Sequence, residues 1–254
     1  MRKAATQAAL PKIELIKNSE AWEVHWDYQE APESAVLFKR VVQGVARRHG
    51  FEATFMAKPY ADQASSGMHI HMSVLNDAGE NIFADPAPEG SLLLRQAIGG
   101  MMQTLPAAMA LAAPGANSWR RFQVGSYAPT IIGWGVNNRT APLRIPAGGP
   151  ESRRVEYRIA GADANPYLVL AAILTGMEHG LDAAKEPIAP LNENRQSGID
   201  FPQDMLGAVS AMRDHPVVNQ GLGSEFVMVY CENKRQDHLA FMQEVSAREY
   251  RWFL

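Results

Sequence analysis

Residues 68–75 read MHIHMSVL and alternate apolar with polar side chains. Successive side chains of a strand point to opposite faces, so this alternation predicts a strand with one polar face. His69, His71 and Ser73 share that face. The cluster NDAG at 76–79 follows directly, and its turn-forming residues predict where the strand ends.

A second stretch, residues 153–159, reads RRVEYRI and shows the same alternation. A strand here places Glu156 between Arg154 and Arg158 on one face. Taken alone, such a face is also typical of a surface ion-pair ladder, and a His-x-His pair is also typical of solvated histidines. The charge of the surrounding segment favours a functional site instead.

Seven arginines and no lysine lie between residues 120 and 158, together with two acidic residues. This segment carries a net charge of +5 in a chain whose formal charge is −3. A planar guanidinium can bind phosphate or carboxylate through two parallel hydrogen bonds, so an arginine-only cluster predicts a site for a polyanionic ligand. The sequence has no GxxxxGK[ST] loop, so arginines and a metal ion would have to hold any nucleotide.

Hydrophobic periodicity and turn residues predict the remaining elements. Together they predict an α+β domain in which antiparallel strands form a curved sheet, polar strand faces line a cleft, and helices pack outside. The expected helices cover residues 33–50, 92–105, 167–181, 202–213 and 237–250, with Pro106 ending the second, and further strands cover 81–84, 131–136 and 143–145.

The composition is that of a folded globular chain, with 254 residues of which 46% are hydrophobic and 20% charged. The formal charge of −3 argues against a protein that coats nucleic acid or an anionic membrane. Residues 96–119 are uncharged but too polar and too interrupted by proline for a membrane span. The single cysteine, Cys231, favours a reducing compartment. The first residues lack the apolar run of a signal peptide, so the expected location is the cytoplasm.

Several blocks of the sequence, in order and spacing, resemble the catalytic domain of glutamine synthetase. The resemblance runs from about residue 38 to about residue 181, with a fainter continuation to the C-terminus. The blocks are ATFMAKPYADQASSGMHIHMS (53–73), NSWRRF (117–122), APT (128–130), NNRTAPLRIP (137–146) and SRRVEYRIAGADANPYLVLAA (152–172).

The resemblance implies a set of ligand-binding residues around ATP and a magnesium or manganese ion. His69 and Glu156 correspond to ligands of the metal ion. Arg121 and Arg158 correspond to residues that bind the substrate glutamate. Ser65, which with its neighbour replaces the Asn-Gly usual before SGMH, lies in the same pocket. The residues implied at the ATP are His71, Ser73, Arg139, Arg144 and Arg154, and those implied in catalysis are Arg139 and Arg121.

The implied activity is that of an ATP-dependent ligase, in which ATP converts the glutamate γ-carboxylate to an acyl phosphate that ammonia or an amine then attacks. Ammonia-using members carry a glutamate in the loop after NSxxR, where this chain has Tyr127. A phenol with a pKa near 10 is a poor base at neutral pH. With the pattern WGxxNRT at 134–140, the chain resembles the branch that joins glutamate to amines, such as γ-glutamylputrescine synthetase. Packing of the loop explains Tyr127 equally well.

The sequence departs from the family upstream of residue 38. Gapless extension places Glu20 at the carboxylate ligand of the family's GQxE segment, whereas Trp22-Glu23 resembles that motif locally; we favour Glu20. Glu14 is one position out of register with the other expected carboxylate. The family's Glu-x-Glu metal strand has no counterpart in these 254 residues.

These departures lead to an expectation about organisation and leave two functions open. Residues 1–254 would form a partial catalytic domain, the family's N-terminal β-grasp domain would lie outside them, and a full-length form would be a homo-oligomer. The chain is then either a glutamate–amine ligase or a nucleotide-binding or regulatory relative with impaired catalysis. Its expected partners are small-molecule substrates rather than nucleic acid or a membrane.

Overall fold

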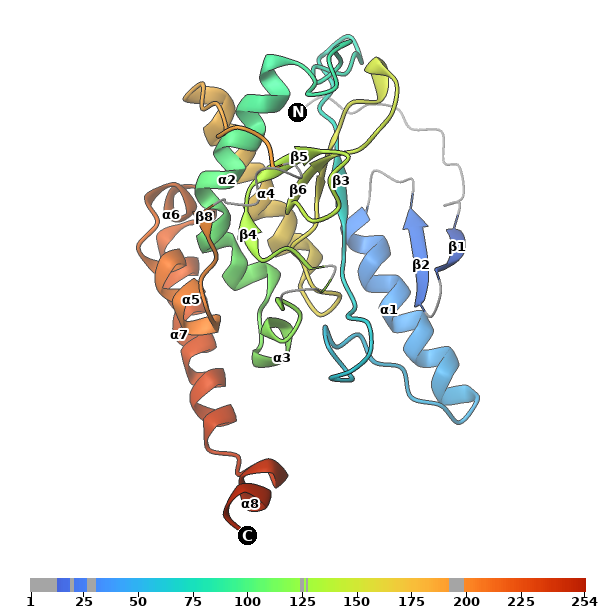
Figure 1. The fold of residues 1–254 in the computed structure, drawn as a ribbon, viewed down its shortest axis with the longest axis vertical. Helices are drawn as coiled ribbons and strands as arrows, with labels where there is room; N and C mark the ends of the chain where they lie inside the picture. The colour runs from blue at the N-terminus through green and yellow to red at the C-terminus, as the bar shows by residue number, and fades with distance from the viewer. Residues whose placement is uncertain (1–12, 19–20, 27–30, 124–125, 127, 192–198) are drawn as a thin grey trace. The chain divides into compact units, whose positions relative to one another are not determined.

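A computed structural model of the 254-residue chain describes residues 13–18, 21–26, 31–123, 126, 128–191 and 199–254. The chain divides into two compact units, Met1–Thr54 and Phe55–Leu254. Figure 1 labels the helices and strands of both units, which are described separately below.

The first unit contains a strand pair and one helix. Strands β1 (Ile13–Asn18) and β2 (Ala21–Trp26) pair in antiparallel fashion. Helix α1 (Ala31–Arg48) begins with an acidic residue in its first turn and ends with two arginines, the charge order that the helix dipole favours. The helix predicted over 33–50 is therefore confirmed, whereas the strand pair was not predicted.

The second unit is built on a four-stranded sheet with the order β3-β7-β6-β5. Strand β7 pairs in antiparallel fashion with β3 and β6, while β5 runs parallel to β6. The predicted antiparallel sheet is confirmed for three strands, and the fourth makes the sheet mixed. The strands are β3 (Ile70–Met72), β5 (Trp134–Val136), β6 (Leu143–Ile145) and β7 (Val155–Tyr157).

The strand predicted over 131–136 is divided at Gly133. A Cβ at Gly133 would lie 2.5 Å from Leu191 Cδ1, so the close approach of that side chain requires glycine here. Strand β4 (Ile131–Ile132) precedes the break and pairs with β8 (Ile199–Asp200) in a separate two-stranded sheet. The pairing predicted for residues 81–84 is reduced to an isolated bridge between Leu75 and Asn81.

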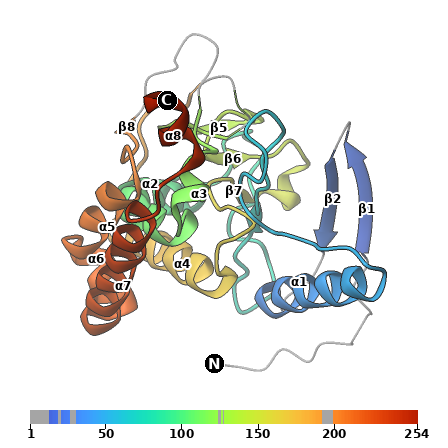
Figure 2. The ribbon, with the colours of Figure 1, turned by 90° about the horizontal axis from the view of Figure 1, so that it is seen from below.

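Helices α2 (Leu92–Ala112) and α4 (Pro166–Asp182) pack against each other and lie on one side of the four-stranded sheet (Figure 2). The prediction that Pro106 ends the first of these helices is wrong, because α2 continues to Ala112. Its last turn consists of buried apolar residues, and their burial offsets the hydrogen bond that proline cannot donate. No helix in the described ranges has the length and apolar content needed to cross a membrane.

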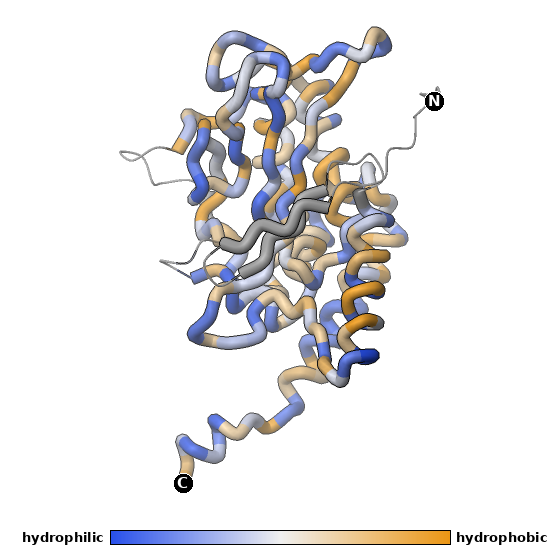
Figure 3. Tube along the Cα trace, turned by 90° about the vertical axis from the view of Figure 1, so that its right-hand side faces the viewer, coloured by the Kyte–Doolittle hydropathy of each residue, from blue (hydrophilic) through white to orange (hydrophobic). Residues whose placement is uncertain are grey.

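The remaining helices follow α4 or lie in the connections. The helix predicted over 237–250 is wrong in extent, because a capping box at Ser246 and Glu249 starts a new helix there. Figure 3 shows hydrophilic and hydrophobic residues close together along this C-terminal segment. The elements are α3 (Ala116–Trp119), the 3-10 helix η1 (Pro150–Ser152), α5 (Met205–Arg213), α6 (Pro216–Leu222), α7 (Ser224–Met242) and α8 (Ala247–Phe253).

The core of the second unit joins the sheet to the helices. Val155 and Tyr157 of β7 are buried in the same apolar cluster as Ile98 of α2 and Ile173 of α4. Because strand side chains alternate, Glu156 points away from this cluster. The predicted arrangement, with helices on one side of the sheet and polar strand residues on the other, is confirmed.

Candidate functional site

The site is centred on the carboxylate of Glu156, which is 2% exposed. His71 on β3 and Arg144 on β6 lie directly opposite Glu156 in the two strand pairs. Opposed residues of an antiparallel pair project to the same face, so three strands deliver their side chains to one place. The two polar strand faces predicted from the alternating sequences therefore meet at Glu156.

Four basic side chains surround this carboxylate. Glu156 Oε2 accepts a hydrogen bond of 2.6 Å from Arg144 Nη1, and Oε1 accepts one of 2.6 Å from Arg158 Nη1. His69 Nδ1 lies 3.2 Å and His71 Nε2 lies 3.9 Å from Oε1. A buried charge is tolerated when it is paired and hydrogen-bonded, and Glu156 meets both conditions.

A third arginine and an amide complete the cluster. Arg154 Nε donates to His71 Nδ1 over 3.2 Å, and Arg144 Nη2 donates to Asn137 Oδ1 over 2.7 Å. Three guanidiniums against one carboxylate leave an excess of positive charge, and both imidazoles are about 40% exposed. The cluster can therefore attract and orient an anion that arrives from solvent.

The protonation states follow from this packing. Burial raises the pKa of Glu156, but hydrogen bonds from His69 and Arg144 and the charge of Arg158 outweigh it and hold the pKa well below its usual range. Glu156 is therefore ionised at neutral pH. Burial lowers the pKa of His71 to about 4, although the charge of Glu156 opposes this shift. His71 is neutral at pH 7, so its Nδ1 can accept the hydrogen bond from Arg154.

Arg121 follows α3 and is only 3% exposed. Its Nη1 donates to the Ile159 carbonyl over 2.8 Å. Its guanidinium lies beside the backbone bridge between Gly67 and Gly161, where a Cβ on Gly67 would be 3.0 Å from Nη2. Burial lowers the pKa of Arg121 to about 10, while the charge of Asp163 acts in the opposite direction. Arg121 is therefore a buried cation at neutral pH.

Three of the predicted site residues form no hydrogen bond or ion pair with this cluster. Arg139 is exposed in the loop between β5 and β6, and Ser73 is exposed beyond β3. Ser65 is half-buried. Their side chains form no hydrogen bond or ion pair with the described part of the chain. The roles assigned to them therefore stay predictions.

Comparison with known proteins identifies the family. A model of the glutamine synthetase catalytic domain matches residues 20–253. The chain belongs to the glutamine synthetase family. The resemblance and the α+β fold inferred from the sequence are thereby confirmed.

The curated proteins similar to this chain include enzymes with two different names. The chain is 45% identical to the γ-glutamylputrescine synthetase PuuA of Escherichia coli (strain K12) over 231 residues, which are 89% of this chain and 48% of that protein. It is 35% identical to a glutamine synthetase of Halobacterium salinarum over 242 residues, which are 89% of this chain and 53% of that protein. The chain spans about half the length of the curated relatives it matches.

Two solved structures share the fold of this chain. The ligand-free GmaS structure superposes with a TM-score of 0.82 at 32% identity, covering 91% of this chain and 55% of that one. A GmaS/ADP complex gives a TM-score of 0.81 at 30% identity, covering 91% of this chain and 56% of that one.

A family metal ion would find two suitable donors at this site. The ionised carboxylate of Glu156 and the imidazole of His69 converge within 3.2 Å, and both are donor types that divalent ions accept. Among the described residues, no three His, Cys, Asp or Glu side chains are placed so that together they could hold a metal ion. Glu20 and Tyr127 lie outside the described residues, and Glu23 lies in β2 of the first unit.

One arginine of the charged segment has a structural role instead. Arg153 is buried, and its guanidinium donates to the carbonyls of Ala87 over 3.1 Å and Gly148 over 2.9 Å. It ties two loops to the start of β7. The net charge of +5 therefore overstates the charge available to a ligand.

Three polar residues support the arginines and were not assigned roles from the sequence. Asn137 orients Arg144, while Asp163 and Ser118 lie beside Arg121 and form a hydrogen bond of 2.6 Å with each other. All three occur in the blocks that resemble the family, and this position is the signal that could have revealed them.

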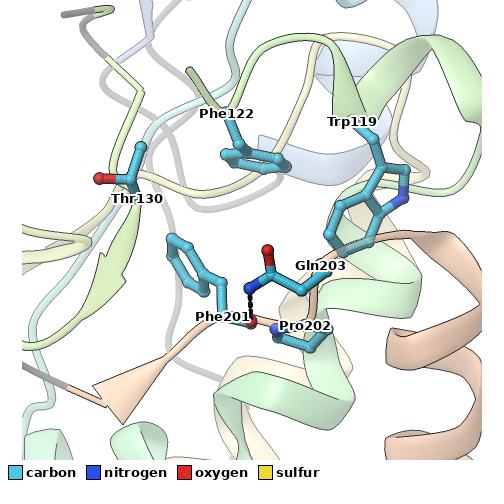
Figure 4. A pocket seen from close by; sticks show the side chains of 6 residues that line it. All are labelled: Trp119, Phe122, Thr130, Phe201, Pro202 and Gln203. Atoms are coloured by element: carbon cyan, nitrogen blue, oxygen red, sulfur yellow. Dashed lines mark hydrogen bonds between the residues drawn. The ribbon is translucent and has the colours of Figure 1, made fainter. Parts of the chain in front are cut away.

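A hollow of about 220 Å³ is lined by three aromatic and three other residues (Figure 4). The Arg121 guanidinium lies 5.6 Å from the centre of the Phe122 ring, which forms one wall. The hollow shares no residue with the Glu156 cluster, so it is a separate feature of the surface. Its lining residues are Trp119, Phe122, Thr130, Phe201, Pro202 and Gln203.

Proposed function

We propose that this chain is the catalytic part of an ATP-dependent ligase that joins the γ-carboxylate of glutamate to ammonia or an amine. The observation that carries the proposal is the cluster of Arg144, Arg154, Arg158, His69 and His71 around the ionised carboxylate of Glu156. Anionic substrates need such a concentration of fixed positive charge. Membership of the glutamine synthetase family supplies the reaction class.

The arginines would bind and orient two anions. Arg144 and Arg154, with Arg139, would contact the phosphates of ATP, and Arg121 and Arg158 would bind the carboxylates of glutamate. Glu156 already holds the guanidiniums of Arg144 and Arg158, and Asn137 also holds that of Arg144, so these two arginines need little reorganisation when substrate binds. His71 and Ser73 would lie along the nucleotide, and Ser65 along the glutamate.

The reaction proposed has two steps. A γ-carboxylate oxygen of glutamate attacks the γ-phosphorus of ATP, and ADP leaves. The amine nitrogen then attacks the acyl carbon, phosphate leaves, and the nitrogen loses a proton. A magnesium or manganese ion held by His69 and Glu156 would offset negative charge on the transferred phosphoryl group. Glu20, in the segment compared with the family's GQxE motif, stays a separately proposed metal ligand.

The proposal also extends to the nucleophile, which we propose is an amine. Identity of 45% to a γ-glutamylputrescine synthetase, against 35% to a glutamine synthetase, supports an amine rather than ammonia. Tyr127 at the position of the family's glutamate supports the same choice. We further propose that the protein acts in the cytoplasm and that its full-length form assembles with copies of itself.

Release of ADP tests the proposal directly. The chain would be incubated with magnesium, ATP and glutamate, together with ammonium, putrescine or ethylamine in parallel. We expect ADP release that depends on glutamate and is faster with an amine than with ammonium. The variant Arg158→Gln should abolish it, whereas Arg235→Gln, in an exposed ion pair on α7, should match the wild type. No turnover with any nucleophile would contradict the ligase proposal.

A second candidate is a nucleotide-binding relative without catalysis. It is favoured by the hydrogen bonds that both oxygens of Glu156 accept from arginines, because these compete with metal ligation. Calorimetry separates the two candidates. Magnesium-dependent ATP binding without amine-dependent ADP release would favour the second.

A further inference from the structure

A carboxylate beside Arg121 takes no part in the proposed chemistry. Asp163 Oδ2 accepts a hydrogen bond of 2.6 Å from the Ser118 hydroxyl. Ser118 is buried, and its Oγ accepts in turn from the Gly115 N–H over 3.1 Å. Two hydrogen bonds in series therefore fix the Asp163 carboxylate against the start of α3.

The carboxylate and the guanidinium meet at the backbone of Gly161. A Cβ placed on Gly161 would overlap Asp163 Oδ1 and would lie 3.4 Å from Arg121 Nη1. The two charged groups are therefore neighbours across a space that only glycine leaves open. They interact through their charges rather than as a direct ion pair, and the charge of Asp163 favours the protonated form of Arg121 against the effect of burial.

Both groups carry polar atoms that no other described residue satisfies. Asp163 Oδ1 and Arg121 Nε are buried and have no hydrogen-bond partner within the described part of the chain. Buried polar atoms without partners are rare in folded proteins. A direct bidentate pair would have satisfied both atoms but would also have occupied the guanidinium. Separation leaves the guanidinium able to bind another anion, while the carboxylate still compensates its charge.

We propose that Asp163 is a positioning residue that holds the Arg121 guanidinium where it binds the anionic substrate, without touching that substrate itself. The identity of the anion, a carboxylate of glutamate, rests on the proposed function. The coupling between Asp163 and Arg121 does not rest on it, so the two can be tested separately.

The first test measures coupling by thermal unfolding of the full chain. Asp163→Asn keeps an oxygen that accepts from Ser118 and removes the charge. In the presence of Arg121 it should lower Tm by about 2–4 °C. In the Arg121→Gln background it should have little effect, since the charge to be compensated is gone. Asp204→Asn is the matched control: this residue caps α5, so its Tm shift should be equal in both backgrounds.

The second test measures steady-state kinetics. Asp163→Asn should raise the KM for glutamate about tenfold and leave the KM for ATP unchanged. A residue with only a structural role would not separate the two constants. Equal Tm shifts in both backgrounds overturn the inference, as does an unchanged glutamate KM in an active enzyme. Coupled Tm shifts in a chain without glutamate-dependent turnover would support the inference and contradict the proposed function.

Discussion

Arg144 on β6 and Glu156 on β7 lie opposite each other, and Arg144 Nη1 donates a hydrogen bond of 2.6 Å to Glu156 Oε2. Arg158, two residues after Glu156 and just past the end of β7, donates to the other oxygen of the same carboxylate. One buried anion therefore holds two cations in fixed positions before any substrate arrives. The pairing stabilises the fold and prepares the site at the same time.

The variant Glu156→Gln should show how much this buried pairing contributes to stability. Removal of one partner leaves two buried or nearly buried guanidiniums uncompensated, and such a loss costs about 3 kcal/mol of unfolding free energy. Urea unfolding followed by tryptophan fluorescence would measure the loss. Glu232→Gln removes a carboxylate from an exposed ion pair on α7 and should leave the midpoint unchanged. Equal midpoints for both variants would show that the buried cluster adds no stability.

Stability should also fall on acidification from about pH 6.5. The folded-state pKa of His71, about 4, lies below the ordinary value of 6.5. Between about pH 6.5 and pH 4 the unfolded chain therefore binds a proton that the folded chain does not. The pKa of Glu156 is also lowered by folding. Glu156 therefore contributes to the free energy of unfolding above its ordinary pKa near 4.3, and this contribution is lost as the pH falls further. His71 and Glu156 therefore both lower the free energy of unfolding as the pH falls.

His71→Gln isolates the imidazole contribution. The variant should flatten the dependence of unfolding free energy on pH between about 6.5 and 4, measured in urea with a chelator present. His49→Gln changes a histidine of the first unit and should keep the wild-type slope. If His71→Gln also kept that slope, neutral burial of His71 would be disproved.

The geometry of the polar faces could be predicted from the sequence because strand alternation is strictly local. The two-residue repeat of a strand was enough to place His69 and His71 on one face of their strand. The same repeat placed Glu156 on the polar face of the second strand. Their meeting across β3 and β7 could be inferred only from the family resemblance, because strand pairing is a long-range property of the chain.

Two of the errors came from interactions that are distant along the chain. Pro106 predicts a helix end locally, but burial of the following turn in the core keeps α2 intact. Leu191 packs on Gly133 and divides one predicted strand in two. Asp163 has no charged neighbour in the sequence at strand or helix spacing, so local patterning alone could not place it beside Arg121.

Gly67→Ala should weaken glutamate binding with little change in ATP binding. The new Cβ would lie 3.0 Å from Arg121 Nη2, closer than an ordinary contact, so the buried guanidinium must move. Steady-state kinetics should show an increase of about tenfold in the glutamate KM. Gly44→Ala adds a methyl group where no atom lies within 4 Å and should leave both constants unchanged. A normal glutamate KM in Gly67→Ala would place the substrate away from Arg121.

Arg153 and Arg139 should give opposite results although both belong to the same charged segment. Arg153→Gln loses the charged hydrogen bonds to Ala87 and Gly148, so we expect a loss of about 3 kcal/mol in unfolding free energy. Arg139 is exposed, so Arg139→Gln should unfold like the wild type. Its kcat/KM for ATP should nevertheless fall at least about tenfold, because a phosphate contact would be lost. Normal ATP kinetics in folded Arg139→Gln would remove this arginine from the site and leave Arg144 and Arg154 as the proposed phosphate ligands.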